Sequence, residues 1–180
     1  MLIFTSSVVA ALLGSVACFV VPTNLPDGFY TVYEGSDIPI RQPDIELQAT
    51  GARDVSNHPR NLFKRLVDPL THCDNYAFNG DNYSTALRNM NSWCNDQGGA
   101  LAGNTLKFFV SGTAVAYVCN YTDGRNTCFH EFEQANDIMD VVCGRGRPVS
   151  VHVAAYAKTL GRANTGVDIC FAGTHAKTIE

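Results

Sequence analysis

The chain has 180 residues, of which 46% are hydrophobic and 17% are charged. This length holds one domain and a processed leader but not two full globular units, and the composition is too apolar for a disordered chain. The formal net charge of −4 at pH 7 leaves no broad basic field, so we expect no nucleic acid as the main partner.

Residues 1–17 have the composition of a secretory signal peptide. The segment is apolar, and the small residues Ser15 and Ala17 stand where a signal peptidase requires them. We expect cleavage after Ala17 or Cys18 and a secreted, extracellular product. The alternative is a retained membrane anchor or a buried first helix. No later segment has the run of about 20 apolar residues that a spanning helix needs, so we expect no stable membrane insertion.

Residues 18–65 form a region rich in turn-forming residues. One run within it, Phe29–Tyr33, has the aromatic and β-branched composition of a strand. The region ends at Lys64 and Arg65, a dibasic pair that a processing protease of the secretory pathway could cut. Two interpretations stay open: residues 18–65 are a pro-segment removed at this pair, or they are an N-terminal extension and the pair is an ordinary solvated one. The working domain is expected at residues 66–180.

Six cysteines remain if Cys18 leaves with the leader, and all of them lie after residue 72: Cys73, Cys94, Cys119, Cys128, Cys143 and Cys170. In an oxidising compartment, six cysteines predict three disulfides. The alternative is a set of buried thiols or a zinc site, but no pair has the short C-x-x-C spacing that structural zinc usually uses. The residues alone leave the pairing open.

Two N-x-S/T sequons support an exported glycoprotein. They place candidate glycans on Asn82 and Asn120. Such triplets also occur by chance, and Asn120 directly follows a cysteine.

The cysteine-containing part predicts alternating helices and strands. Ser84 and Thr85 cap an expected helix that Gly98–Gly99 ends, and its apolar residues are Ala86, Leu87, Met90, Trp93 and Cys94. A second helix is expected over residues 128–143, with Thr127 as its cap, Gly144 at its end, and one apolar face of Phe132, Ala135, Ile138, Met139 and Val142. Strands are expected at residues 105–110, 113–121, 149–155 and 167–172, with a turn at residues 161–166. This order predicts an α+β fold, an antiparallel sheet with both helices packed on one face and crosslinked by disulfides.

Several short motifs recur in one known family: Trp93-Cys94, the stretch Gly112–Val118, Asn126-Thr127-Cys128, Cys143-Gly144 and Cys170. Over about residues 90 to 171 the chain resembles the smut-fungus killer toxin family (killer protein four-like) and related small secreted cysteine-rich fungal effector proteins. The resemblance implies a disulfide-crosslinked α/β sandwich, secretion, and toxin or virulence-effector action without a catalytic centre. Calcium-channel block is the activity of the founding type.

The same resemblance implies a disulfide pairing and one binding residue. The implied pairs are Cys73–Cys143, Cys94–Cys128 and Cys119–Cys170. Channel block in that family depends on a basic residue near the Gly112–Val118 strand, and Lys107 is the nearest candidate.

Four cations flank the predicted strand at residues 149–155 and form a second candidate binding site. Arg145 and Arg147 precede the strand, and Lys158 and Arg162 follow it. If the two loops meet, the four side chains make a basic patch for an acidic partner. The alternative is two ordinary turns whose cations keep the chain soluble.

Catalytic and metal chemistry find weaker support. His130-Glu131 lacks the second histidine of H-E-x-x-H, so we expect no metal there and a solvated first helical turn instead. A secreted ribonuclease is the main enzymatic alternative, with His152, Glu131 and Arg145 or Arg147 as its acid–base set. No cofactor is expected, and six paired cysteines leave no thiol nucleophile.

We therefore expect a monomeric, non-catalytic, killer-toxin-like effector. It would bind a protein or surface target in a host or competitor organism, with a calcium channel as one possible target. The alternatives are a small secreted hydrolase such as a ribonuclease, or a structural protein of the fungal surface.

Overall fold

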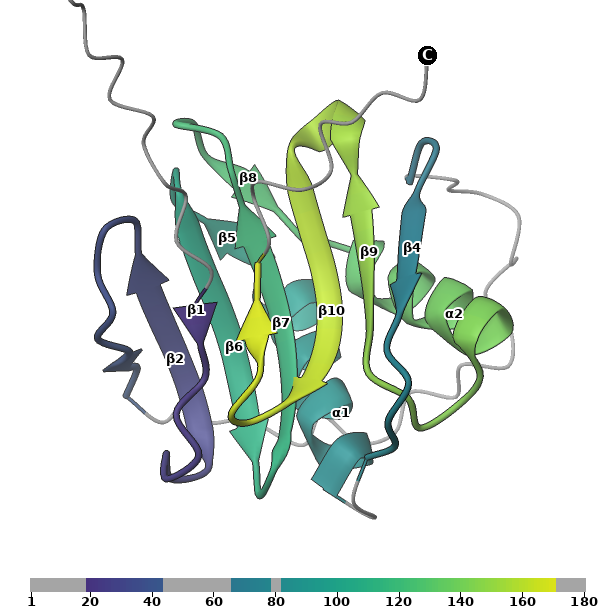
Figure 1. The fold of residues 1–180 in the computed structure, drawn as a ribbon. Coiled ribbons are helices and arrows are strands. Elements are labelled where there is room, and N and C mark those ends of the chain that lie inside the picture. The colour runs from purple at the N-terminus through teal and green to yellow at the C-terminus, as the bar shows by residue number, and fades with distance from the viewer. Residues whose placement is uncertain (1–18, 44–65, 79–81, 171–180) are drawn as a thin grey trace, which may run out of the picture.

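The computed structural model describes residues 19–43, 66–78 and 82–170, which form three layers. The central layer is a seven-stranded sheet in which every neighbouring pair is antiparallel (Figure 1). In spatial order its strands are β3 (Ile40–Arg41), β2 (Gly28–Tyr33), β6 (Thr105–Ser111), β7 (Ala114–Asn120), β10 (Lys158–Asn164), β9 (Val149–Val153) and β4 (Leu70–Cys73).

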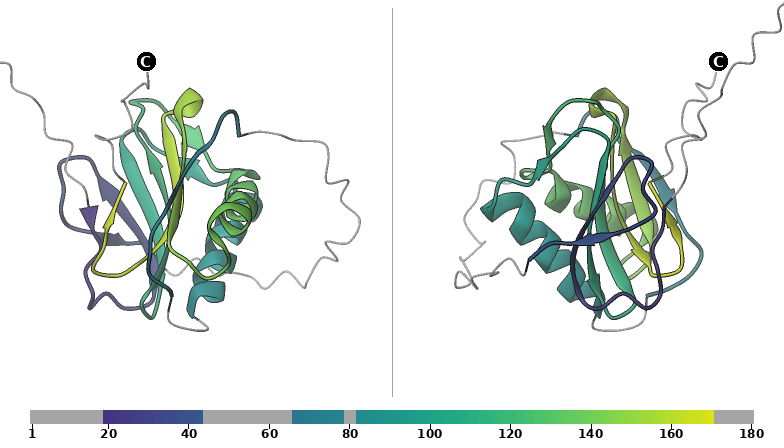
Figure 2. Two further views of the ribbon diagram at one scale, coloured as in Figure 1. Left: turned by 45° about the vertical axis from the view of Figure 1, so that its right-hand side comes forward. Right: turned by 90° about the vertical axis from the view of Figure 1, so that its left-hand side faces the viewer.

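Two helices, α1 (Asn82–Asp96) and α2 (Glu131–Cys143), cover one face of this sheet (Figure 2). Helix α1 packs on β6 and β7, and α2 packs on β4, β9 and β10. The apolar residues expected to face the core from α1 are all buried, as are Phe132, Ala135 and Met139 of α2. The predicted α+β architecture, with both helices on one face, is confirmed.

Of the two caps predicted for α2, the structure has the one at the C-terminal end but not the one at the N-terminal end. Gly144 closes the helix with a φ of 87°, as expected. The helix begins at Glu131, however, after His130 with a φ of 58° and no side-chain cap. The hydroxyl of Thr127, the expected cap, instead donates to Gly98 O at 2.6 Å and accepts from Phe129 N at 3.1 Å.

The opposite face of the sheet carries a two-stranded ribbon of β1 (Phe19–Val20) and β11 (Asp168–Ile169). Figure 1 shows this ribbon in front of β6 and β7, with the helices behind. Phe19 and Ile169 are buried in a second apolar cluster together with Phe108. A further pair, β5 (Ala100–Leu101) and β8 (Asn126–Thr127), and a short 3₁₀ helix (Ala154–Tyr156) complete the described elements. None of the described helices is long and apolar enough to cross a bilayer.

The region expected as a pro-segment or extension contributes strands to the main sheet. Strand β2 contains the predicted run Phe29–Tyr33 and lies between β3 and β6, with Phe29 and Tyr30 buried. Residues 19–43 therefore belong to the same sheet as the described residues from 66 onward, and Phe29 packs in the apolar cluster under the helices. The expected signal peptide and the Lys64–Arg65 pair lie outside the described residues, so cleavage at either position stays a prediction.

Strand β10 corrects the turn expected at residues 161–166. Residues Lys158–Asn164 form a strand that pairs with β7 on one side and β9 on the other. Gly161 lies under the ring of Tyr117, where an added Cβ would come within 2.2 Å of the ring carbon Cζ. The glycine therefore marks a close approach within the sheet and not a turn.

The described residues contain three disulfides, in the pairing that the family resemblance implies. Their Cα–Cα distances are 5.5 Å for Cys73–Cys143, 5.2 Å for Cys94–Cys128 and 5.7 Å for Cys119–Cys170, all within the usual range for a disulfide. The first ties β4 to the end of α2, the second ties α1 to the segment before α2, and the third ties β7 to the residue after β11. Each bridge contributes about 2 to 4 kcal/mol by restricting the unfolded chain.

Candidate functional site

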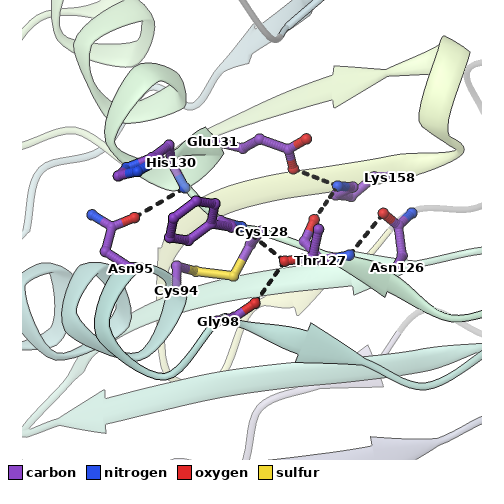
Figure 3. Close-up of a disulfide and its surroundings, with 10 residues drawn as sticks. Cys94, Asn95, Gly98, Asn126, Thr127, Cys128, His130, Glu131 and Lys158 are labelled. Carbon is purple, nitrogen blue, oxygen red and sulfur yellow. Dashed lines mark hydrogen bonds and ion pairs between the residues drawn. A yellow bond between two sulfur atoms is a disulfide. The ribbon is translucent and has the colours of Figure 1, made fainter. Parts of the chain in front are cut away.

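Lys158, one of the four candidate cations, is buried. Its side chain is 1% exposed and forms an ion pair with Glu131 of α2, whose side chain is 8% exposed. The ammonium also donates to the carbonyl oxygen of Thr127 (Figure 3). Because a buried charge needs a partner, Lys158 is committed to the fold and does not form part of a basic surface patch.

The residues around this ion pair connect the two helices. Figure 3 shows the pair beside the Cys94–Cys128 disulfide, whose two residues are fully buried. The Asn95 side chain accepts a hydrogen bond from His130 N at 3.0 Å. Together these contacts hold the start of α2 against the end of α1, so His130 and Glu131 do not form the solvated first turn expected from the sequence.

Arg162, a second candidate cation, is also buried. Its side chain has no exposed surface and points from the centre of β10 towards α2 and the loop after it. The guanidinium donates to both side chains and backbone, so its charge and its N–H groups are used inside the protein. Its acceptors are Tyr83 Oη, Asn136 Oδ1 at 2.8 Å, Asp140 Oδ1 at 2.6 Å, Gly144 O at 3.0 Å and Arg147 O at 2.7 Å.

The loop that follows α2, Gly144–Pro148, carries the other two candidate cations and is called the arginine loop below. Four of its backbone carbonyls accept hydrogen bonds from neighbouring elements. Gly144 O and Arg147 O accept from Arg162, Gly146 O accepts from Phe78 N at 3.0 Å, and Pro148 O accepts from Asp74 N at 3.1 Å. Gly144 and Gly146 have φ angles of 87° and 70°, which favour glycine. These hydrogen bonds from β10 and from the segment after β4 fix the backbone of the loop.

The arginine loop displays its two cations outward. The Arg145 side chain is 91% exposed, and its Nε lies 3.6 Å from Asp140 Oδ2. Arg147 is also exposed. An ion pair this exposed contributes little to stability, so the Arg145 charge stays available to a partner.

Two exposed valines adjoin these arginines in the chain. Val141 is 85% exposed and Val142 is 58% exposed at the end of α2, although Val142 was expected on the buried face. The spacing from the fully buried Met139 predicted burial of Val142, and the structure overturns this prediction in the last turn of α2. We call Val141, Val142, Arg145 and Arg147 the valine–arginine patch.

Lys107, the binding residue implied by the family resemblance, is half-buried beside α1. Its ammonium donates to Thr31 Oγ1 at 3.2 Å and lies 5.2 Å and 5.4 Å from the ring centroids of Phe29 and Trp93. Burial lowers the pKa of this ammonium. The charge of Lys107 is therefore less accessible to a partner than the charge of Arg145.

The acid–base set of the ribonuclease alternative is divided between the two faces of the sheet. Val151 and Val153 pack in the core under the helices, so His152 between them points to the other face. There its Nδ1 lies 3.0 Å from Thr159 Oγ1, which also accepts from the Tyr121 hydroxyl at 3.1 Å. Glu131 lies on the helix side with Lys158, so the structure does not bring His152 and Glu131 together.

The two sequons differ in their environment. Asn82 is exposed at the start of α1. Asn120 is 2% exposed, and its Nδ2 donates to Ala102 O at 2.7 Å and to Gly124 O at 3.0 Å. Because a glycan would replace one hydrogen of this nitrogen, the fold corrects the expectation at Asn120 and leaves Asn82 as the candidate.

Comparison with protein families, with curated proteins and with solved structures found no match to this chain. Among the residues that the structure describes, no three His, Cys, Asp or Glu side chains gather as a metal site would require. Of the candidate binding residues that the structure describes, Arg145 and Arg147 keep exposed charges, so the valine–arginine patch is the candidate functional site.

Proposed function

We propose that this chain is a secreted, non-catalytic effector of the killer-toxin type that binds an acidic target at the surface of another organism's cells. The observation that carries the proposal is the fixed backbone of the arginine loop. Arg162 donates hydrogen bonds to two carbonyl oxygens of this loop, while Arg145 and Arg147 are exposed.

A fixed loop favours binding because less conformational entropy is lost when the partner docks. Arginine is also enriched among the residues that contribute most to protein interfaces. Val141 and Val142 add exposed apolar surface next to the two charges. Exposed apolar surface adds to what a partner can bury, and arginine is enriched at interfaces.

The charge distribution favours an acidic partner. The chain carries a formal net charge of −4, whereas the arginine loop is locally cationic. A partner with clustered carboxylates would be attracted to this loop and repelled elsewhere, which orients the encounter. A cation channel lined with acidic side chains is one target of this kind.

Secretion is supported by two independent features. The apolar residues 1–17 have the composition of a leader, and the three disulfides are typical of proteins from oxidising compartments. The same disulfides favour a rigid ligand that keeps its shape outside the cell.

A cell-binding experiment tests the proposal. The purified protein is labelled with a dye, its binding to a panel of competitor fungal cells and host cells is measured by flow cytometry, and growth inhibition is recorded in parallel. We expect the pair Arg145→Glu and Arg147→Glu to reduce binding about tenfold or more, as loss of interface arginines typically does.

A matched control carries the same charge change on another surface. Arg88 and Arg125 are exposed and lie in α1 and in the loop before β8, so Arg88→Glu with Arg125→Glu should leave binding within about twofold of the wild type. Equal losses in both pairs, or unchanged binding in the Arg145 and Arg147 pair, would reject the valine–arginine patch. RNA cleavage by a protein that binds no cells would support the ribonuclease instead, and retention in the producing cell's wall would support the structural protein.

A further inference from the structure

We propose that the Cys73–Cys143 disulfide is a thiol-exchange site, which low-molecular-weight thiols such as glutathione open selectively, and that opening it releases the arginine loop. The first part depends only on the accessibility of the disulfides. The second part depends on the contacts that fix the loop, and only its effect on cell binding rests on the function proposed above.

The three disulfides differ sharply in exposure. Cys94 and Cys128 are 0% exposed, and Cys119 and Cys170 are 2% and 9% exposed. In contrast, Cys73 is exposed and Cys143 is partly exposed. Thiol–disulfide exchange requires a thiolate to reach a sulfur atom, so Cys73–Cys143 is the bridge that a dissolved thiol can attack in the folded protein.

The interior bridges are also enclosed by their neighbours. A Cβ added to Gly99 would lie 2.4 Å from Cys128 Sγ, so backbone covers this sulfur directly. Cys119 and Cys170 belong to the apolar cluster under the β1–β11 ribbon. Opening either bridge would require part of the core to move first.

The exchange proceeds in two steps whose atoms and electrons balance. A glutathione thiolate attacks Cys73 Sγ, a new S–S bond forms, and Cys143 leaves as a thiolate that takes a proton from water. A second glutathione thiolate then attacks the glutathione sulfur of this mixed disulfide and releases the Cys73 thiolate, which is protonated in turn. The products are two protein thiols and one molecule of glutathione disulfide, so the protein is reduced and glutathione is oxidised.

This bridge adjoins the arginine loop at both of its ends. Cys143 directly precedes the loop, and Cys73 directly precedes Asp74, whose N–H donates to Pro148 O. Phe78, a few residues further, donates to Gly146 O. Once the bridge is open, β4 is still paired with β9 and packed on α2, but the backbone donors that fix the loop lose the disulfide that ties them to the end of α2.

Differential alkylation tests the exchange site. The folded protein is incubated with glutathione for increasing times, thiols are trapped with N-ethylmaleimide, and labelled cysteines are identified by peptide mass spectrometry. We expect Cys73 and Cys143 to be labelled at least about tenfold faster than the other four, because reaction rates follow access. In guanidinium, all six should react together. Earlier opening of Cys94–Cys128 or Cys119–Cys170, or simultaneous opening of all three under native conditions, would overturn the proposal.

A second measurement tests release of the loop. Hydrogen exchange at the amides of Asp74 and Phe78, which donate to the loop carbonyls, should accelerate at least about tenfold in the double variant Cys73→Ser and Cys143→Ser, because these bonds would open more often. Exchange in α1 should stay unchanged, which shows that the variant is folded. Unchanged exchange at Asp74 and Phe78 would reject release of the loop while leaving the alkylation result intact. Failure of the wild type to bind cells would reject the proposed function and neither of these two results.

Discussion

Arg162 Nη1 donates to Asp140 Oδ1 at 2.6 Å, while Oδ2 of the same aspartate lies 3.6 Å from Arg145 Nε. One carboxylate therefore joins a buried guanidinium in the central sheet to an exposed guanidinium in the arginine loop. This relationship links the stability of the fold to the presentation of the valine–arginine patch.

Replacing Arg162 should destabilise the protein strongly. Arg162→Met leaves Asp140 without its buried partner and leaves the carbonyls of Gly144 and Arg147 without donors, so we expect a loss of about 3 to 5 kcal/mol in the free energy of unfolding. Guanidinium denaturation measures it. Arg162→Lys keeps the charge but has fewer donors, so its free energy of unfolding should lie between those of the wild type and Arg162→Met. A loss below about 1 kcal/mol in Arg162→Met would contradict this account.

The buried pair of Lys158 and Glu131 should be strongly coupled. Lys158→Met alone or Glu131→Leu alone leaves one buried charge unpaired, and we expect each to cost about 3 to 5 kcal/mol. The double variant should recover much of that loss, because no unpaired charge remains. A double-mutant cycle from denaturation midpoints measures the coupling, and purely additive losses would show that the two side chains do not interact.

The contribution of Lys107 to stability should depend on pH. Burial lowers its pKa in the folded protein below the ordinary value of 10.5, so between these two pKa values the unfolded chain binds more protons. Stability relative to Lys107→Met should therefore rise as the pH increases through the lowered pKa, and level off above 10.5. Unfolding free energies of both proteins at neutral pH and at about pH 10 measure this difference. A difference that falls with pH would be inconsistent with a desolvated ammonium.

Glycosylation should be confined to Asn82. The side chain of Asn120 is buried and bonded to two carbonyl oxygens, so a glycan there is incompatible with the folded state. Protein secreted from a glycosylating host should carry glycan that Asn82→Gln abolishes, as measured by intact mass before and after deglycosylation. Glycan on Asn120 in folded protein would require a different environment for this residue.

Cleavage after Arg65 should leave the N-terminal segment bound. Strand β2 pairs with β6 along its length and buries Phe29 and Tyr30, but the three disulfides join only cysteines from Cys73 onward. Size-exclusion chromatography of the nicked protein should show one species in native buffer and two fragments in guanidinium without reductant. Spontaneous release of the segment in native buffer would support its role as a removable pro-segment.

The elements predicted from the sequence are those whose pattern of apolar residues lies within the element itself. Residues Phe29–Tyr33, the two strands around Gly112 and both helices carry apolar residues at the spacing of their own element, so neighbouring residues were enough to indicate them. The three disulfide pairs were implied by the family resemblance, because cysteine positions alone are compatible with many pairings.

The tertiary structure alone decided β10 and the valine–arginine patch. The positions of β10 that face the helices are Lys158, Leu160 and Arg162, and two charges beside a glycine conceal the alternation of a buried strand. Such charges can be buried only because carboxylates of α2, Glu131 and Asp140, approach them. Because Lys158 and Arg162 are buried, Arg145 and Arg147 are the exposed members of the four candidate cations. That outcome depends on contacts between residues far apart in the chain, which no local pattern encodes.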